Sequence, residues 1–410
     1  MLLAHLLRHL MVQGTLRVID AGGQTHTFSG SSGDSVTIRL HDRKLERQLF
    51  FNPRLRLGEA YMDGRLTIED GSLYDFLDLV ASNIELAPRS VLTPLYNGFG
   101  RAFRTFQQYN PVGRAQQHVA HHYDLSDALY DTFLDSDRQY SCAYFTEPDQ
   151  SLETAQANKK RHIAAKLMLA PGQRVLDIGS GWGGLALYIA RECGVEVTGL
   201  TLSREQLQVA RKRAQALGLA DRARFELLDY RQATGSYDRI VSVGMFEHVG
   251  VGYYAGFFRK VKELLAPDGV ALLHAIGRAD GPAATNPWIR KYIFPGGYSP
   301  AMSEVVPVIE RSGMYITDIE ILRLHYAETL KAWRTRFLAN RERIRALYDD
   351  RFCRMWEFYL AGSEVAFRYQ GHIVFQMQLA KKVGTVPLTR DYITDWERRN
   401  RVPLATDRAA

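Results

Sequence analysis

The sequence has few cysteines and no long apolar run, and each shortage excludes a class of protein. Only three cysteines occur in 410 residues, far apart at Cys142, Cys193 and Cys353. An odd number at these spacings supplies neither a disulfide framework nor a zinc site, which suits a reducing cytoplasm. No apolar run is long enough to cross a bilayer. We therefore expect a cytoplasmic protein with no transmembrane span.

Repeats and low-complexity tracts are also missing. Hydrophobic residues make up 46% of the chain and charged residues 24%, as in folded globular proteins. A chain of this length is too long to fold around one ordinary hydrophobic core, so two domains are expected. A net charge of +7 permits an acidic partner, either nucleic acid or an anionic membrane surface, and charge alone does not choose between them.

The N-terminal segment Met1–Val12 predicts an amphipathic helix with leucines along one side. Polar residues interrupt it and no small-residue cleavage site follows, which argues against a signal peptide. A packing helix is favoured over a membrane anchor. Short predicted strands follow at Thr15–Asp20, Thr25–Phe28 and Ser35–Leu40, and a helix is predicted at Leu73–Ala81. We predict a small N-terminal accessory domain over residues 1–87.

Residues 88–120 are rich in proline and aromatic residues and are predicted to form a linker and helical segment. Residues 121–410 then alternate apolar strand patterns with helical ones. This alternation predicts an α/β fold with a doubly wound, mostly parallel sheet. The predicted strands of its first part are Arg174–Ile178, Val195–Leu200, Arg224–Leu228, Arg239–Val243 and Val270–Ile276.

Two arginine-rich helical segments, Glu328–Asp349 and Phe352–Tyr369, lie between the later strand candidates Tyr315–Leu322 and His372–Gln378. They predict a helical cap insertion at about 280–370. The arginines of the first segment are either a basic patch or a solvated helix face.

A glycine-rich loop, Gly179–Gly184, follows the first core strand and precedes a helix, which is the context of a nucleotide site. A dinucleotide fold needs a carboxylate at the tip of the second strand, and Thr201-Leu202-Ser203 stands there instead. Asp177, inside the first strand, could orient the ammonium group of an amino acid. This combination favours S-adenosylmethionine (SAM) over a dinucleotide.

Other polar residues fall at predicted strand ends, on the same edge of the sheet. Thr201 and Gln206 could contact the ribose or the methionine part of the ligand, and Asp229 could accept from an adenine amino group. Each could instead be a turn or cap residue, and Ser203 is a good N-cap for the next helix. His274 lies within an apolar strand, where a buried core role and a functional role are both open.

Upstream, His121 and His122 offer only a weak metal site, and Cys142 would need a nearby base to act as a nucleophile. With these segments the chain resembles the cyclopropane fatty acid synthase family. The motifs that carry the resemblance are His-His-Tyr-Asp at 121–124, Tyr-Ser-Cys-Ala-Tyr-Phe at 140–145, Leu-Asp-Ile-Gly-Ser-Gly-Trp-Gly-Gly at 176–184, Phe-Glu-His-Val-Gly at 246–250 and Leu-His-Tyr-Ala-Glu-Thr-Leu at 324–330.

The resemblance implies a class I SAM methyltransferase fold and cyclopropanation of cis double bonds in phospholipid acyl chains. It implies a bicarbonate base held by Cys142, Glu247, His274, Ile276 and Tyr326. It implies SAM contacts at Tyr140, Ser141, Gly179, Gly181, Thr201, Gln206 and Asp229, to which Asp177 is added from its place in the strand. Glu247 would accept the bicarbonate proton or hold His274 charged.

The implied partners are unsaturated phospholipids at the inner face of the membrane, with peripheral contact, no nucleic acid and a homodimeric assembly. Three alternatives stay open. A related enzyme would leave a methyl or methylene branch, a more distant one would methylate small amines, and a non-catalytic protein would bind lipid surfaces with a relict SAM pocket.

Overall fold

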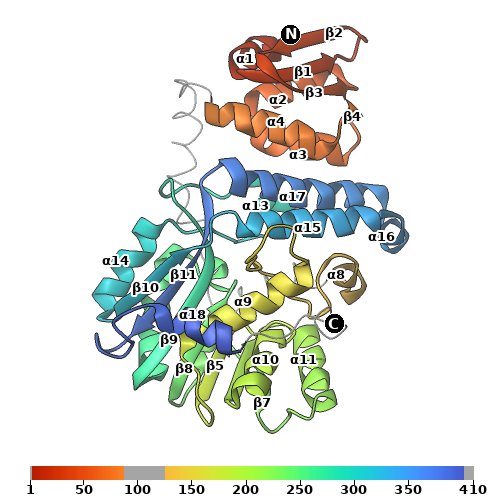
Figure 1. The fold of residues 1–410 in the computed structure, drawn as a ribbon. Helices are drawn as coiled ribbons and strands as arrows, with labels where there is room; N and C mark the ends of the chain where they lie inside the picture. The colour runs from red at the N-terminus through yellow and green to blue at the C-terminus, as the bar shows by residue number, and fades with distance from the viewer. Residues whose placement is uncertain (1, 87–124, 401–410) are drawn as a thin grey trace. The chain divides into compact units, whose positions relative to one another are not determined.

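The computed structural model describes residues 2–86 and 125–400 (Figure 1). The chain divides into two compact units, each described here by itself. The N-terminal unit comprises Met1–Arg104, Ala283–Pro295 and Ala327–His372. The core unit comprises Thr105–Pro282, Gly296–Tyr326 and Ile373–Ala410. Most of the segment expected as a cap is therefore grouped with the N-terminal unit, while residues 296–326 belong to the core.

The N-terminal unit has a four-stranded sheet in the order β2-β1-β3-β4. Its strands are β1 (Gln13–Ile19), β2 (Thr25–Ser29), β3 (Ser31–Leu40) and β4 (Leu66–Asp70). β1 runs antiparallel to β2 and parallel to β3, and β3 runs antiparallel to β4. The first three strands confirm the prediction, whereas β4 was not predicted.

The described helices of this unit are α1 (Leu2–Leu10), α2 (Arg43–Phe51), α3 (Pro53–Met62), α4 (Leu73–Leu86), α13 (Pro287–Tyr292), α15 (His325–Ala339), α16 (Arg341–Leu347) and α17 (Asp350–Tyr369). One apolar core contains buried residues of α1, α2, α3, α4 and α17. Leu3 and Leu7 of α1 are buried in the same cluster as Ala361 of α17, which supports the packing interpretation of α1. The helix predicted over Glu328–Asp349 is in fact α15 and α16, which meet at Asn340.

The core unit has a seven-stranded sheet in the order β10-β11-β9-β8-β5-β6-β7. Its strands are β5 (Arg174–Ile178), β6 (Glu196–Thr201), β7 (Ala223–Leu227), β8 (Tyr237–Val243), β9 (Leu265–Arg278), β10 (Tyr315–Ile321) and β11 (His372–Ala380). The pairs from β9 through β8, β5 and β6 to β7 are all parallel, and β10 is antiparallel to β11. The mostly parallel sheet is therefore confirmed.

Helices cover both faces of this sheet, as expected for a doubly wound fold (Figure 1). One apolar cluster joins the sheet to α9 (Leu152–Leu167), α10 (Gly184–Cys193) and α11 (Arg204–Ala216). A second joins the opposite face to α12 (Tyr254–Leu264) and α14 (Met302–Ser312). The shorter helices α8 (Asp127–Phe133) and α18 (Asp391–Arg399) complete the unit.

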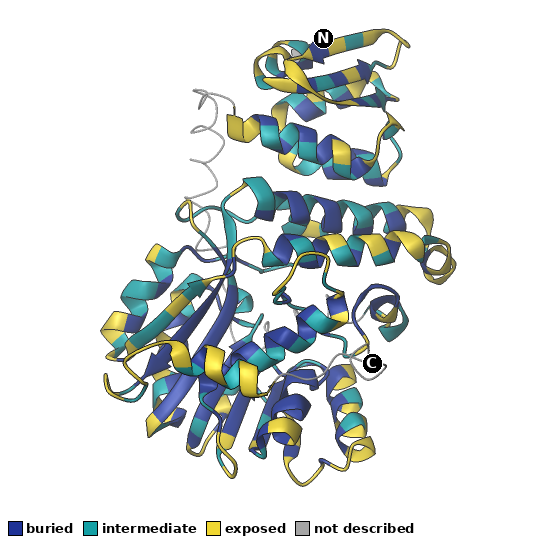
Figure 2. Ribbon diagram, in the orientation of Figure 1, coloured by how far each residue is buried: buried dark blue, intermediate teal, exposed yellow. Residues whose placement is uncertain are grey.

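Burial on both faces explains why the central strands are almost continuously apolar. In β5, Val175, Leu176 and Ile178 have at most 1% of their surface exposed, and the strands are dark blue in Figure 2. Within residues 2–86 and 125–400, no helix combines the length and the apolar character that crossing a bilayer requires.

Candidate cofactor pocket and acid–base cluster

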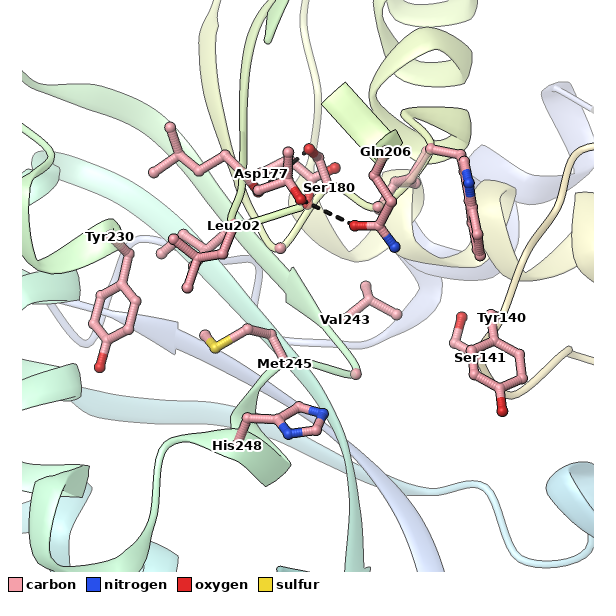
Figure 3. Close-up of a pocket in the computed structure, with 18 of the residues that line it drawn as sticks. Tyr140, Ser141, Asp177, Ser180, Leu202, Gln206, Tyr230, Val243, Met245 and His248 are labelled. Atoms are coloured by element: carbon pink, nitrogen blue, oxygen red, sulfur yellow. Dashed lines mark hydrogen bonds between the residues drawn. The ribbon is translucent and has the colours of Figure 1, made fainter. Parts of the chain in front are cut away.

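A cavity opens at the carboxyl ends of β5, β6, β7 and β8, where parallel sheets of this kind place their ligands. Residues from the segments after each of these strands line it, together with residues 138–141 (Figure 3). All the residues expected to contact SAM are in its wall: Tyr140, Ser141, Asp177, Gly179, Gly181, Thr201, Gln206 and Asp229. The structure therefore brings this predicted set together.

The glycine loop shapes the cavity wall. Gly179 has a φ of 87°, and a Cβ atom there would lie 2.8 Å from Cβ of Met245, so only glycine fits. The amides of Gly179 and Ser180 donate to the carbonyl of Leu200 over 3.0 Å and 2.8 Å. The amides of these two residues are therefore bonded within the fold, where they hold the loop against β6.

Asp177 is a buried carboxyl with an unused oxygen. Only 2% of its surface is exposed, and Oδ2 has no hydrogen-bond partner. Burial raises its pKa to about 7, and the positive charge of Lys159 partly opposes the rise. A cationic group in the cavity would pair with this oxygen and stabilise the ionised form.

The segments after β6 and β7 hold their polar groups in place. The Thr201 hydroxyl donates to Oε1 of Gln206 over 2.9 Å, and the Ser203 side chain accepts from the Gln206 amide over 3.2 Å, which confirms Ser203 as the N-cap of α11. Asp229 accepts from the guanidinium of Arg231 through both oxygens, at 2.8 Å and 2.6 Å. Its carboxylate is thus already ion-paired where the adenine contact was expected.

Tyr140 and Ser141 are held from two sides. The Tyr140 ring packs edge-on against Tyr130, with 5.5 Å between ring centroids, and Tyr130 packs in the same way against Trp182. Behind them, Nζ of Lys159 in α9 donates to the hydroxyl of Ser141 over 2.8 Å. These contacts fix the segment that joins the cofactor cavity to Cys142.

Among the described residues, none of the five expected around bicarbonate lines the cavity itself. Two of them are bonded to each other: the Ile276 amide donates to Oε1 of Glu247 over 2.6 Å. The other carboxylate oxygen of Glu247 is buried without a partner. Burial raises the Glu247 pKa to about 7, opposed by the Ile276 hydrogen bond. Glu247 therefore titrates near neutrality, beside the cavity-lining His248.

His274 lies two residues before Ile276 on β9 and is 2% exposed. Gln376 of β11 donates from its side-chain nitrogen to Nδ1 of His274 over 3.1 Å, which places the ring proton on Nε2. Burial, together with Lys159 and Lys166, lowers the His274 pKa to about 3. This lowered pKa favours the neutral imidazole over the alternative in which Glu247 holds His274 charged.

The two remaining residues come from motifs that the fold joins. Cys142 is buried, and its thiol donates to the carbonyl of Ala143 over 3.3 Å. Tyr326, 7% exposed, is in the first turn of α15. Next to it, His325 stacks on Tyr144 at 4.8 Å between centroids, so residues 140–145 and 324–330 meet here. His121 and His122 lie outside the described residues.

Two residues of this region were not predicted, Lys159 and Gln376. Lys159 belongs to the run Asn-Lys-Lys-Arg, which is typical of a solvated surface, and no local pattern marks it as buried. Gln376 reaches His274 across 102 positions of sequence. Only the three-dimensional packing of α9 and β11 against the core reveals these contacts.

Known proteins match this chain over most of its length. Residues 112–377 match the family described as mycolic acid cyclopropane synthetase. The cyclopropane-fatty-acyl-phospholipid synthase of Escherichia coli strain K12 is 37% identical, covering 84% of this chain and 88% of that protein. Tuberculostearic acid methyltransferase UfaA1 of Mycobacterium tuberculosis is 35% identical, covering 92% of this chain and 90% of that protein.

A solved structure agrees with these relatives. The mycolic acid cyclopropane synthase CmaA1, complexed with SAH and CTAB, superposes with a TM-score of 0.61 at 33% identity, covering 66% of this chain and 99% of that one. The mostly parallel sheet with helices on both faces agrees with this match. The chain therefore belongs to the mycolic acid cyclopropane synthetase family and is a SAM-dependent methyltransferase.

Proposed function

We propose that the protein adds the methyl carbon of SAM across cis double bonds of phospholipid acyl chains and closes a cyclopropane ring. The observation that carries this proposal is Glu247, a buried carboxyl with one unpartnered oxygen and a pKa raised to about 7, next to the cofactor cavity. Methyl transfer to an alkene leaves a carbocation that must lose a proton, so the reaction needs an acceptor in a dry site.

The reaction balances without any oxidant or reductant. The π electrons of the double bond form a bond to the methyl carbon while its bond to sulfur breaks, which leaves a cation on the other alkene carbon. The new methyl group then loses a proton, and the electrons of that C–H bond form the second ring bond. We assign the guiding of this proton to His274 and Glu247, two buried acid–base groups whose pKa values burial shifts to about 3 and about 7.

We further propose that the site binds a small oxyanion with one hydroxyl group. His274 offers an Nε2–H donor, and the unpartnered oxygen of Glu247 can accept. The amide of Ile276 is already bonded to Glu247 and is not a further donor in this arrangement. A bicarbonate held by these groups and Cys142 would supply a base for the proton.

A second candidate function has support from a relative. UfaA1 is described as a tuberculostearic acid methyltransferase and is about as similar to this chain as the E. coli cyclopropane synthase. Such an enzyme would transfer the same methyl group to an acyl chain and leave a branch. The first steps are shared, and the fate of the cation distinguishes the two.

The direct test incubates the protein with SAM and vesicles of monounsaturated phosphatidylethanolamine or phosphatidylglycerol, followed by mass spectrometry of the lipids. We expect each modified chain to gain the mass of one methylene unit. Vesicles of saturated lipid are the matched control and should stay unchanged. A lipid that binds the protein with no turnover of SAM would favour the non-catalytic alternative.

Hydrogenation of the product distinguishes a ring from a branch. A cyclopropane chain keeps its mass under mild hydrogenation, whereas a methylene-branched chain takes up one molecule of hydrogen. A saturated methyl branch would need an added reductant during the enzyme reaction. We expect a product that resists hydrogenation and forms without any reductant.

The lipid substrate implies peripheral contact with a membrane, which we propose together with a homodimeric assembly and no nucleic-acid partner. The arginines of α15 and α16 are weak support for this contact. Arg334 pairs with Glu364 at 3.0 Å, and Arg345 pairs with Glu342 at 2.7 Å, so their charge is locally offset. Flotation of the protein with anionic vesicles, compared with neutral ones, measures the contact.

A further inference from the structure

Lys159 of α9 is a buried lysine that forms no ion pair among the described residues, and burial lowers its pKa to about 8. It is 1% exposed, and Nζ donates to Oε1 of Gln139 over 2.7 Å and to the hydroxyl of Ser141 over 2.8 Å. Both acceptors are neutral. The negative charges of Asp135 and Asp137 oppose the effect of burial only in part, so a further negative charge in the cavity would stabilise the ammonium form.

A negatively charged group can reach Lys159 from the cavity. Lys159 lines the cavity, as do both of its acceptors. An ammonium group has three N–H donors, and these two hydrogen bonds leave one of them unassigned. A ligand in the cavity can therefore take the third donor.

Asp177 lines the same cavity, is negatively charged when ionised, and has an oxygen that can still accept a hydrogen bond. Its Oδ2 is buried without a partner, and no ion pair joins it to Lys159 among the described residues. The two charges are close enough for Lys159 to influence the Asp177 carboxyl. The cavity wall thus presents the Lys159 ammonium group and the Asp177 carboxyl group without an ion pair between them. This arrangement suits a ligand that carries a carboxylate and an ammonium group at the same end.

We propose that Lys159 binds the carboxylate of the methionine part of SAM while Asp177 binds its ammonium group. Gln139 and Ser141 hold the lysine so that its third N–H points at the ligand. The polypeptide from Gln139 to Cys142 is thereby tied to the bound cofactor. This inference rests on the SAM site alone and not on the lipid substrate or on ring closure.

Ligand truncation combined with substitution tests the proposal. Dissociation constants are measured by isothermal titration calorimetry for S-adenosylhomocysteine and for its decarboxylated analogue, which keeps the ammonium group. For Lys159→Met we expect S-adenosylhomocysteine to bind roughly ten- to one-hundred-fold more weakly, the range for a hydrogen bond to a charged group. The decarboxylated analogue should bind the variant and the unsubstituted protein equally well.

The matched control is Lys160→Met, one position along the same helix. Lys160 pairs with Asp137, which keeps Arg213 as a second partner, so its removal leaves no carboxylate unpaired. This control should bind both ligands as the unsubstituted protein does. If Lys159→Met does not fold, as judged by circular dichroism, Lys159→Gln replaces it with a neutral polar group.

An equal loss for both ligands would overturn the proposal, because it would mean that Lys159 only supports Gln139 and Ser141. Unchanged binding of both ligands would overturn it too. No lipid is present in these titrations. Failure here would therefore leave the acyl-chain proposal standing, and a protein inactive on lipid could still give the expected pattern.

Discussion

Two carboxyl side chains of the core unit, Asp177 and Glu247, are each buried with one oxygen that has no partner. Burial raises the pKa of each to about 7. An unpartnered buried carboxyl costs stability, so both sites are better explained by what they bind than by how they hold the fold. The two carboxyl groups have different expected roles, because Asp177 lines the cofactor cavity and Glu247 lies beside it.

Glu247→Gln should stabilise the protein at alkaline pH while it removes activity. The folded pKa is raised from 4.5 to about 7, so the folded state holds a proton that the unfolded state loses across this window, and stability falls as pH rises through it. Glutamine does not ionise, so the variant should gain on the order of 1–3 kcal/mol at about pH 8 and less below about pH 5. Thermal unfolding across pH measures the gain. An equal shift at every pH would contradict the assigned titration.

Cofactor affinity should fall on acidification because of Asp177. Its carboxylate is required to pair with an ammonium group, and its pKa in the free protein is about 7. Affinity for S-adenosylhomocysteine should therefore fall by up to about tenfold per pH unit as the pH drops below that value. Asp177→Asn should bind weakly with a flat profile. A flat profile for the unsubstituted protein, measured by calorimetry, would exclude Asp177 as the ammonium partner.

At the scale of elements, the turn between β5 and α10 shows how the glycine loop sets the cavity. Gly179 lies in this turn and has a φ of 87°. Gly172, which lies before β5, also has a positive φ, 80°. A Cβ atom on Gly179 would meet Met245 at 2.8 Å, whereas one on Gly172 would meet nothing within 4 Å. Comparing alanine substitutions at the two positions therefore separates the free-energy cost of backbone strain from the cost of the clash with Met245.

Gly172→Ala should lose about 1 kcal/mol of stability from backbone strain and keep its cofactor affinity. Gly179→Ala should lose more, about 2–4 kcal/mol, and bind S-adenosylhomocysteine weakly, because the loop or Met245, which lines the cavity, must shift to relieve the clash. Denaturant unfolding and calorimetric titration measure the two effects. Equal behaviour of the variants would show that the close approach to Met245 has no role.

Helices and strands whose apolar residues form a simple pattern could be predicted from the sequence. α9 could not, because its buried residues form no such pattern. β5 was predicted with its observed bounds because it is an apolar run ended by glycine. In α9 the buried residues include Gln156, Lys159 and Lys166, so no apolar stripe distinguishes a core-facing side. Burial of polar residues by partners distant in sequence, such as Gln139 for Lys159, leaves no local pattern.

For the whole molecule, the sheet and its ligand edge could be predicted because parallel strands must place their carboxyl ends together. This rule found Thr201, Gln206 and Asp229. The grouping of α17 with the N-terminal unit could not be predicted. It depends on contacts such as the 3.0 Å hydrogen bond from the Tyr61 hydroxyl to Glu357, which join segments far apart in the chain. Peripheral contact with a membrane stays a prediction.

The central claim is that a methyl group from SAM bonds to an acyl-chain alkene and then loses a proton to close a ring. The most direct measurement uses SAM with a fully deuterated methyl group, vesicles of monounsaturated phospholipid and mass spectrometry before and after hydrogenation. We predict a product that keeps two of the three deuterium atoms and resists hydrogenation. A product that retains all three, or no labelled lipid at all, would contradict the account.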